Sequence, residues 1–251
     1  MIEIKNVSAG YGDKLVLNSI NLCLRPGRII ALTGPNGSGK STLFQAMTKQ
    51  LPVSEGDILY DGISISSFTQ RRLARRVAFM PQNRNVPNST ALRMVLHGRF
   101  PYLAYPRMYS KEDQRIAQEA LRMADAEGVA SEYLPELSGG QRQKVYLAMA
   151  LAQDTETILM DEPITFLDIQ HQLSLMRLVG GLVTQKKQVI MVLHDLRLAM
   201  QYADEIVVLD HGRIASTGTP EEILEQRVID SVFGIRLCRF ATDSGWQYYY
   251  G

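Results

Sequence analysis

One stretch of the sequence has the residue types and spacing of a phosphate-binding loop. Residues 34–42 read Gly-Pro-Asn-Gly-Ser-Gly-Lys-Ser-Thr, which follows an apolar run and precedes a helical stretch. Glycines let backbone N–H groups point into one concavity, and the helix N-terminus adds its partial positive charge. Lys40 can reach the β- and γ-phosphates, and Ser41 can ligate Mg²⁺. The predicted phosphate-binding residues are Gly34, Asn36, Gly37, Ser38, Gly39, Lys40, Ser41 and Thr42.

A second candidate is a pair of carboxylates at the end of an apolar strand, 157–160. Such strands deliver their C-terminal residues to the sheet edge where ligands bind in open α/β folds. Asp161 would hold Mg²⁺, and Glu162 could polarise an attacking water. Because an acidic pair after a strand is usually only a solvated turn, this prediction depends on the upstream loop.

A third candidate is Leu137-Ser138-Gly139-Gly140-Gln141, which precedes the helical stretch 142–152. A serine and two glycines at a helix N-terminus form a second anion-binding site. One nucleotide does not obviously need two such sites from one chain.

In this order the motifs resemble the ABC ATPase family, the nucleotide-binding subunits of ABC transporters, and the resemblance covers essentially the whole chain. It implies an α/β fold with a P-loop NTPase (RecA-like) core, an N-terminal antiparallel β subdomain and an inserted α-helical subdomain. It further implies hydrolysis of ATP with Mg²⁺ by two facing copies. Ser138, Gly139, Gly140 and Gln141 of one copy would complete the ATP site of the other.

The same resemblance assigns four more residues. Tyr11 stands where the family stacks an aromatic ring on adenine, and Gln82 where a glutamine touches Mg²⁺ or the water and senses the membrane subunit. Asp168 matches the loop that crosses the dimer interface, and His194 matches the histidine that contacts the γ-phosphate. By themselves, a tyrosine in a Gly-Tyr-Gly turn and a lone histidine after a strand are ordinary surface or structural residues. Ile164 replaces the family's usual threonine, and we expect only altered packing there.

Two further motifs, 96–102 and 161–172, look like those of ATPase subunits of importers for iron-siderophores, haem and cobalamin. They can equally serve to pack the helical subdomain and one helix. The resemblance implies a second ATPase subunit, a permease docked near Gln82 and residues 95–106, and indirectly a solute-binding protein. The importers that the chain resembles generally use two identical ATPase subunits, but the sequence leaves open whether the second subunit is identical or a homologue. It places the chain peripherally on the cytoplasmic face of the cell membrane, and it leaves the cargo open because this subunit does not touch it.

Other functions remain open at this stage. An exporter subunit would carry the same motifs. A soluble ABC ATPase acting on DNA or the ribosome usually has a long coiled-coil insertion or two cassettes, and neither is visible here. A P-loop kinase would give residues 137–141 no role.

Composition supports a globular protein, since 45% of the 251 residues are hydrophobic. The formal net charge of +1 gives no reason to expect nucleic acid as a partner. We expect Cys23 and Cys238 to be reduced core thiols, because they are far apart without metal-ligand spacing and cytosolic proteins keep their thiols reduced. Apolar runs such as 189–193 are too short to span a bilayer, and residues 1–5 lack the apolar stretch of a signal peptide.

The hydrophobic pattern predicts the order of the elements. Period-two alternation at 20–25 and the Asp61-Gly62 turn indicate antiparallel strands, followed by a short strand at 77–79. From about 67 to 152 the pattern is mainly helical, with helix-start boxes at Ser67 and Ser110. The later predictions are a strand at 157–160, a helix at 167–184, strands at 189–193 and 206–209, a helix from about 196 and a hairpin at 237–250.

This alternation predicts a parallel sheet with helices on its faces. We expect one ABC ATPase domain over 1–251, in which about 1–85 and 153–251 form the β subdomain and core, and about 86–152 the helical subdomain. Arg71, Arg72, Arg75 and Arg76 suggest a solvated or acid-paired helix face rather than a site for nucleic acid or lipid. Gly180-Gly181 inside a helical stretch mark either close packing or a helix break.

Overall fold

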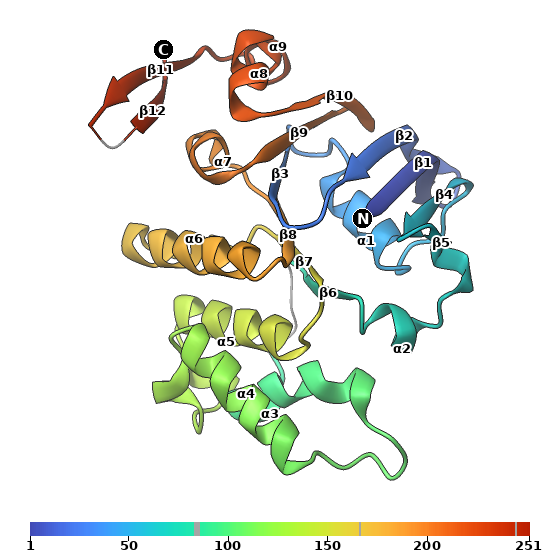
Figure 1. Cartoon of the computed structure of the whole chain (residues 1–251), viewed down its shortest axis with the longest axis vertical. Coiled ribbons are helices and arrows are strands. Elements are labelled where there is room, and N and C mark those ends of the chain that lie inside the picture. Colours follow the sequence, from blue (N-terminus) through green and yellow to red (C-terminus); the bar gives the residue numbers. More distant parts are fainter. Residues whose placement is uncertain (83–85, 166, 244) are drawn as a thin grey trace. The chain divides into compact units, whose positions relative to one another are not determined.

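The computed structural model describes residues 1–82, 86–165, 167–243 and 245–251 (Figure 1). The chain forms two compact units. The first comprises Met1–Phe68 together with Gln188–Gly251, and the second is continuous from Thr69 to Lys187. The first unit is therefore built from both ends of the chain.

An antiparallel sheet occupies the start of the first unit, in the order β2-β1-β4-β5. Its strands alternate buried and exposed side chains where one face packs on the core, as Ile20 to Leu24 show in β2. The predicted turn at Asp61-Gly62 joins the last two strands. The bounds are β1 (Ile2–Tyr11), β2 (Lys14–Leu24), β4 (Glu55–Tyr60) and β5 (Ile63–Ser64).

Parallel strands form the other sheet of this unit. β3 (Ile29–Thr33) lies between β8 (Gln188–Val192) and β9 (Glu205–Asp210) and is parallel to both. β10 (Arg213–Gly218) adds an antiparallel edge on β9. Every residue of β3 and β8 is buried, which explains their continuous apolar sequences.

Helices and a terminal hairpin complete the first unit. The helix α1 (Lys40–Met47) follows the glycine-rich loop. The predicted hairpin at the end of the chain is present as β11 and β12. The remaining bounds are η1 (Ile65–Ser67), α7 (Leu196–Tyr202), α8 (Pro220–Glu225), α9 (Val228–Phe233), β11 (Leu237–Thr242) and β12 (Gly245–Tyr250).

The second unit contains two parallel strands, and the chain between these two strands forms a helical segment. β6 (Val77–Met80) pairs in parallel with β7 (Thr157–Asp161). In the helical segment α3, α4 and α5 pack against one another, as Figure 1 shows in green. The bounds are α2 (Gln70–Leu73), α3 (Ala91–Leu96), η2 (His97–Tyr102), α4 (Lys111–Met123), η3 (Glu127–Val129), η4 (Leu134–Glu136), α5 (Gly139–Ala152) and α6 (Ile169–Thr184).

The predicted α/β class, with an N-terminal antiparallel sheet and an inserted helical segment, is confirmed. The helix start at Ser110 is also confirmed, because Ser110 and Asp113 form a complete capping box on α4. The box at Ser67 is wrong. Ser67 ends the short helix η1, and Thr69 caps α2 by accepting a hydrogen bond from the Arg72 backbone.

Two of three smaller predictions need correction. Cys23 and Cys238 are free thiols but not core residues, since Cys23 is exposed and Cys238 half-buried. The predicted solvated or acid-paired arginine face is confirmed, since Arg71, Arg72 and Arg75 are exposed and Arg76 lies 3.8 Å from Glu156, although the helix that begins this segment is only four residues long. Gly180 and Gly181 lie inside the unbroken helix α6, and among the described residues a Cβ placed on either would meet no atom within 4 Å apart from the adjoining helix backbone, so they do not pack closely.

Candidate functional site

The glycine-rich loop of the first unit has the backbone geometry of an anion cradle. Gly34, Gly37 and Gly39 have φ angles of 153°, 78° and 107°, which L side chains rarely adopt. A Cβ on Gly34 would lie 2.0 Å from the Leu209 carbonyl oxygen, so the loop is packed directly on β9. Gly39 at the N-cap of α1 has no side chain to cover the first turn, so this helix N-terminus suits a phosphate.

Lys40 is the charged residue of this loop. Its ammonium donates to the carbonyl oxygens of Gly34 and Pro35, both at 2.8 Å, and lies 3.4 Å from Ser38 Oγ. The side chain is 6% exposed, whereas Asn36, Gly37 and Ser41 are exposed. The loop therefore holds a positive charge in place and keeps its tip and the Ser41 hydroxyl accessible.

Two other predicted residues of this unit lie near the loop. His194 is exposed and comes two residues after Val192, which pairs with Leu32 of β3, so it lies at the strand edge from which the loop begins. Tyr11 ends β1, and its hydroxyl donates to Gln45 Oε1 of α1 at 2.6 Å. Half of the Tyr11 side chain stays exposed, which leaves the ring accessible for stacking.

The acidic pair lies at the end of β7 in the second unit. Asp161 is 3% exposed. Glu162 has a φ of 52°, a strained conformation for a non-glycine residue that turns the chain sharply after the strand. The Thr165 hydroxyl donates to Glu162 Oε2 at 3.2 Å.

Gln82 belongs to the same edge of the strand pair. Met80 of β6 pairs with Met160 of β7, so Gln82 and Glu162 each stand two residues past paired positions. Gln82 is exposed.

Ser138 caps α5 as the motif predicts. Its Oγ accepts from the Gln141 N–H at 3.2 Å, and Gln141 Oε1 accepts from the Ser138 N–H at 2.9 Å. Ser138 and Gln141 are exposed, Gly139 and Gly140 are half-buried, and the first turn of α5 has no acidic residue. This arrangement is a surface-facing helix N-terminus that suits an anion.

Asp168 has a structural role besides its predicted one. It caps α6, and its Oδ1 accepts from the His171 N–H at 2.9 Å and lies 2.7 Å from His171 Nδ1. Hydrogen bonds from His171, first from its backbone N–H and then from its side chain, lower the pKa of the Asp168 carboxyl. Its neighbour Phe166, part of the same motif, lies outside the described residues.

The predicted residues thus fall into two groups. Tyr11, the loop and His194 lie in the first unit, and Gln82, the acidic pair, residues 138–141 and Asp168 lie in the second. Two supporting residues escaped the sequence analysis, namely Thr165 and Gln143, which donates to the Pro163 carbonyl at 2.6 Å. Gln143 lies two residues after the Ser138–Gln141 motif, and this closeness in sequence is the signal that could have indicated its supporting role.

No three His, Cys, Asp or Glu side chains of the described residues gather as a ready-made metal site. A buried carboxylate and exposed hydroxyl and amide groups are the donors that Mg²⁺ uses together with phosphate oxygens. Asp161, Ser41 and Gln82 fit this donor set by type. No helix within the described ranges is long and apolar enough to cross a membrane.

Comparisons with known proteins agree with this set of motifs. The profile described as ABC transporter matches residues 17–165. The chain is 38% identical to the petrobactin import ATP-binding protein FpuD of Bacillus anthracis over 96% of this chain and 89% of that protein. It is 41% identical to the hemin import ATP-binding protein HmuV of Rhodococcus jostii over 93% and 80%. The solved dimeric structure of MJ0796, a bacterial ABC transporter cassette, superposes with a TM-score of 0.79 at 31% identity, over 88% of this chain and 99% of that one.

Proposed function

Because the chain belongs to the ABC transporter family, we propose that it is the ATP-binding and ATP-hydrolysing subunit of an importer for a metal chelate such as an iron-siderophore, haem or cobalamin. The family's activity is that of an ATPase. The names of FpuD and HmuV, which import petrobactin and hemin, favour import of an iron compound over export. The proposed place of action is the cytoplasmic face of the membrane, beneath a permease that receives cargo from a solute-binding protein.

One observation supports the mechanism: the chain has two helix N-termini whose composition suits an anion, those of α1 and α5. A single ATP held by the first leaves the second without a ligand. Two copies that face each other use both, because Ser138 and Gly140 of one copy then meet the γ-phosphate held by the loop of the other.

Within each ATP site, we assign the roles as follows. The loop N–H groups and Lys40 bind the phosphates, Tyr11 stacks on adenine, and His194 contacts the γ-phosphate. Glu162 accepts the proton of the attacking water while it orients that water. Mg²⁺, held by Ser41, Asp161 and Gln82, would neutralise phosphate charge.

ATP binds the closed dimer better than the open one, since the γ-phosphate contacts both copies at once. Hydrolysis and phosphate release remove that preference, so the dimer opens. The motion would reach the permease through Gln82 and the surface near residues 95–106. Within the single domain 1–251, residues of about 86–152 act as the helical subdomain.

The test is Glu162→Gln, which keeps the shape of the side chain and removes the proton acceptor. This variant should bind ATP, form a dimer that depends on ATP, and turn over very slowly. Glu156→Gln is the matched control, because Glu156 lies just before the opposite end of β7 and its side chain is 78% exposed. Analytical ultracentrifugation with and without ATP measures dimer formation, and a phosphate-release assay measures turnover. Wild-type turnover by Glu162→Gln, or an active monomer in which Ser138 is dispensable, would refute the proposal.

A further inference from the structure

The segment η2, residues 97–102, is held tightly in the second unit. A Cβ on Gly98 would lie 2.3 Å from the Met149 carbonyl oxygen, so the segment touches the backbone of α5. The Arg99 side chain is 8% exposed and donates through Nη1 to the Ala152 carbonyl at 3.0 Å. The motif recognised in the sequence is therefore a packing element against the C-terminal end of α5.

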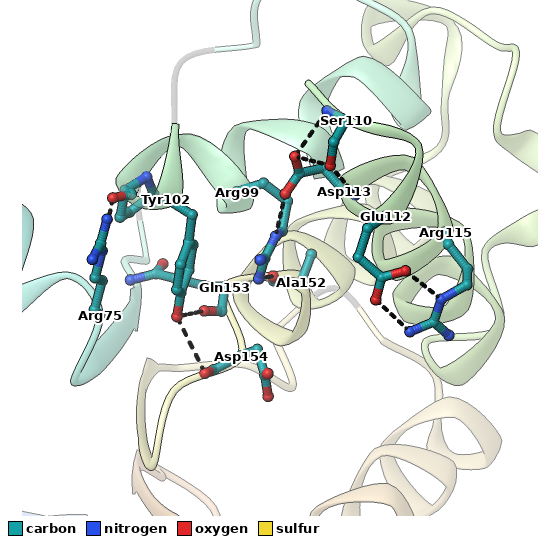
Figure 2. Close-up of polar contacts among 11 residues, drawn as sticks. Arg75, Arg99, Tyr102, Ser110, Glu112, Asp113, Arg115, Ala152, Gln153 and Asp154 are labelled. Carbon is teal, nitrogen blue, oxygen red and sulfur yellow. Dashed lines mark hydrogen bonds and ion pairs between the residues drawn. The ribbon is translucent and has the colours of Figure 1, made fainter. Parts of the chain in front are cut away.

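Tyr102 lies at the centre of a set of contacts (Figure 2). Its ring lies between two guanidinium groups, with Arg99 Cζ 4.1 Å and Arg75 Cζ 5.1 Å from the ring centroid. Its hydroxyl donates to the Gln153 carbonyl oxygen at 2.9 Å and lies 3.4 Å from the Asp154 carbonyl oxygen. Tyr102 thereby joins η2 to the residue that ends α5.

Gln153 continues these contacts toward β6. It is the C-cap of α5, and its side-chain amide donates to the Ala74 carbonyl at 2.6 Å and to the Val77 carbonyl at 3.0 Å. Val77 begins β6, which ends at Met80, two residues before Gln82. One residue thus contacts both the strand that leads to Gln82 and the helix that Ser138 caps.

The arginines before β6 hold η2 from the other side. Arg71 and Arg75 donate through Nε to the Pro101 carbonyl at 2.8 and 2.9 Å, and Arg71 also donates to the Leu103 carbonyl. Arg71 and Arg75 therefore bind protein carbonyl groups. Phe100 in η2 and Tyr105 and Met108 after it are exposed apolar side chains, and the segment 97–108 that carries them overlaps the proposed permease surface near residues 95–106.

We propose that Tyr102 and Gln153 are positioning residues that transmit movement between the permease surface at 97–108 and the two segments that reach ATP, the strand leading to Gln82 and the helix capped by Ser138. The proposal rests on the proposed function. A packing role would need only the Tyr102 ring, whereas transmission needs its hydroxyl and the Gln153 amide, because the hydroxyl ties η2 to Gln153 and the amide ties Gln153 to β6.

Thermodynamic linkage allows the transmission role to be tested by adding ATP to the protein without its permease. If the surface at 97–108 influences ATP binding, then ATP must influence that surface by the same free energy. The parent protein is full-length Glu162→Gln, and amide hydrogen exchange is followed by mass spectrometry with and without MgATP. We expect ATP to slow exchange both at 34–42 and at 97–108.

Tyr102→Phe and Gln153→Met, each added to the parent, should reduce the ATP-dependent change at 97–108 by about fivefold, the size of one net hydrogen bond. Protection at 34–42 should stay intact. Tyr109→Phe is the matched control, since among the described residues its hydroxyl makes no hydrogen bond. Thermal unfolding of every variant checks that the fold is kept, and Tyr102→Phe keeps the stacked ring.

The outcomes separate the two proposals. An unchanged response at 97–108 in both variants, or no response there in a parent whose loop is protected by ATP, overturns the transmission role and leaves the proposed function standing. Absence of protection at 34–42 in the parent refutes the proposed function itself. In a complex purified with its permease, Tyr102→Phe should lower kcat of the permease-stimulated ATPase with an unchanged KM for ATP.

Discussion

Arg99 and Asp113 form a buried ion pair, with Arg99 Nε 3.0 Å from Asp113 Oδ1. The same carboxylate accepts from the Ser110 N–H through Oδ2, so it closes the capping box of α4, and Arg99 bonds the end of α5. Figure 2 shows both sets of contacts. One ion pair therefore fixes the start of α4 against the end of α5.

Asp113→Asn should destabilise the protein by about 3 kcal/mol, because it leaves the Arg99 charge buried without its partner. Glu112→Gln, the neighbouring exposed acid paired with Arg115, should cause no measurable change. The measurement is urea unfolding at pH 7 followed by circular dichroism. Equal stabilities for the two variants would show that the pair contributes nothing.

The pH dependence of this pair follows from its hydrogen bonds. Burial alone would raise the pKa of Asp113, but hydrogen bonds from Ser110 and Arg99 hold it below its ordinary value. A folded pKa below the unfolded one means that the stabilisation is complete above the unfolded pKa of about 3.9 and is lost as pH falls through the folded value. The stability difference between wild type and Asp113→Asn should be constant from pH 7 to 5 and should shrink below pH 4. A difference that grows on acidification would contradict this sign.

Local sequence patterns predicted the elements and the motifs well. Periodicity located the strands, the Ser110 box marked the start of α4 because capping is encoded within four residues, and the motif 137–141 marked the N-terminus of α5. The failure at Ser67 has the same origin, since Thr69 offers an equivalent cap two residues later and the pattern does not rank the two. Cys23 lies on the exposed side of β2, where the alternating pattern itself gave the better prediction.

Contacts between distant segments could not be predicted in this way. Tyr102 and Gln153 are 51 residues apart, and nothing in either local pattern indicates that they meet. The left-handed conformation of Glu162 is set by the turn after β7 and is equally invisible in residue type. Tertiary packing decides such features, and propensity and periodicity do not encode it.

Ser138→Ala should separate the capping role of this serine from its proposed role at ATP. Loss of the cap costs about 1 kcal/mol of stability. Ser110→Ala is a close control, because Ser110 caps α4 with the same kind of box in the same unit. Both variants should lose similar stability in urea, whereas only Ser138→Ala should reduce ATP turnover and ATP-dependent dimer formation. Parallel losses of turnover in both would assign Ser138 a purely structural role.

Glycine positions in the second unit should respond oppositely to alanine. At Gly98 the new methyl group would meet the Met149 carbonyl, so Gly98→Ala should destabilise by about 2 kcal/mol or more through strain. At Gly180, inside α6 and with open space around it, alanine should stabilise by about 1 kcal/mol through helix propensity. Thermal unfolding of the two single variants provides the comparison. A stabilised Gly98→Ala would mean that η2 does not touch α5 as described.

Lys40→Ala tests the phosphate loop itself. The ammonium donates to two loop carbonyls at 2.8 Å, and in the proposed complex it would also bind the phosphates, so its removal takes away charge-assisted hydrogen bonds to ATP. Affinity for ATP should fall at least about a hundredfold, the size of two such bonds. Lys49→Ala is the control, because Lys49 follows α1 and likewise donates to two carbonyls, those of Ser66 and Phe68, outside the loop. It should bind ATP like the wild type and lose only stability. Fluorescent-nucleotide titration at fixed ionic strength measures both, and unchanged ATP affinity of Lys40→Ala would discredit the loop as the phosphate site.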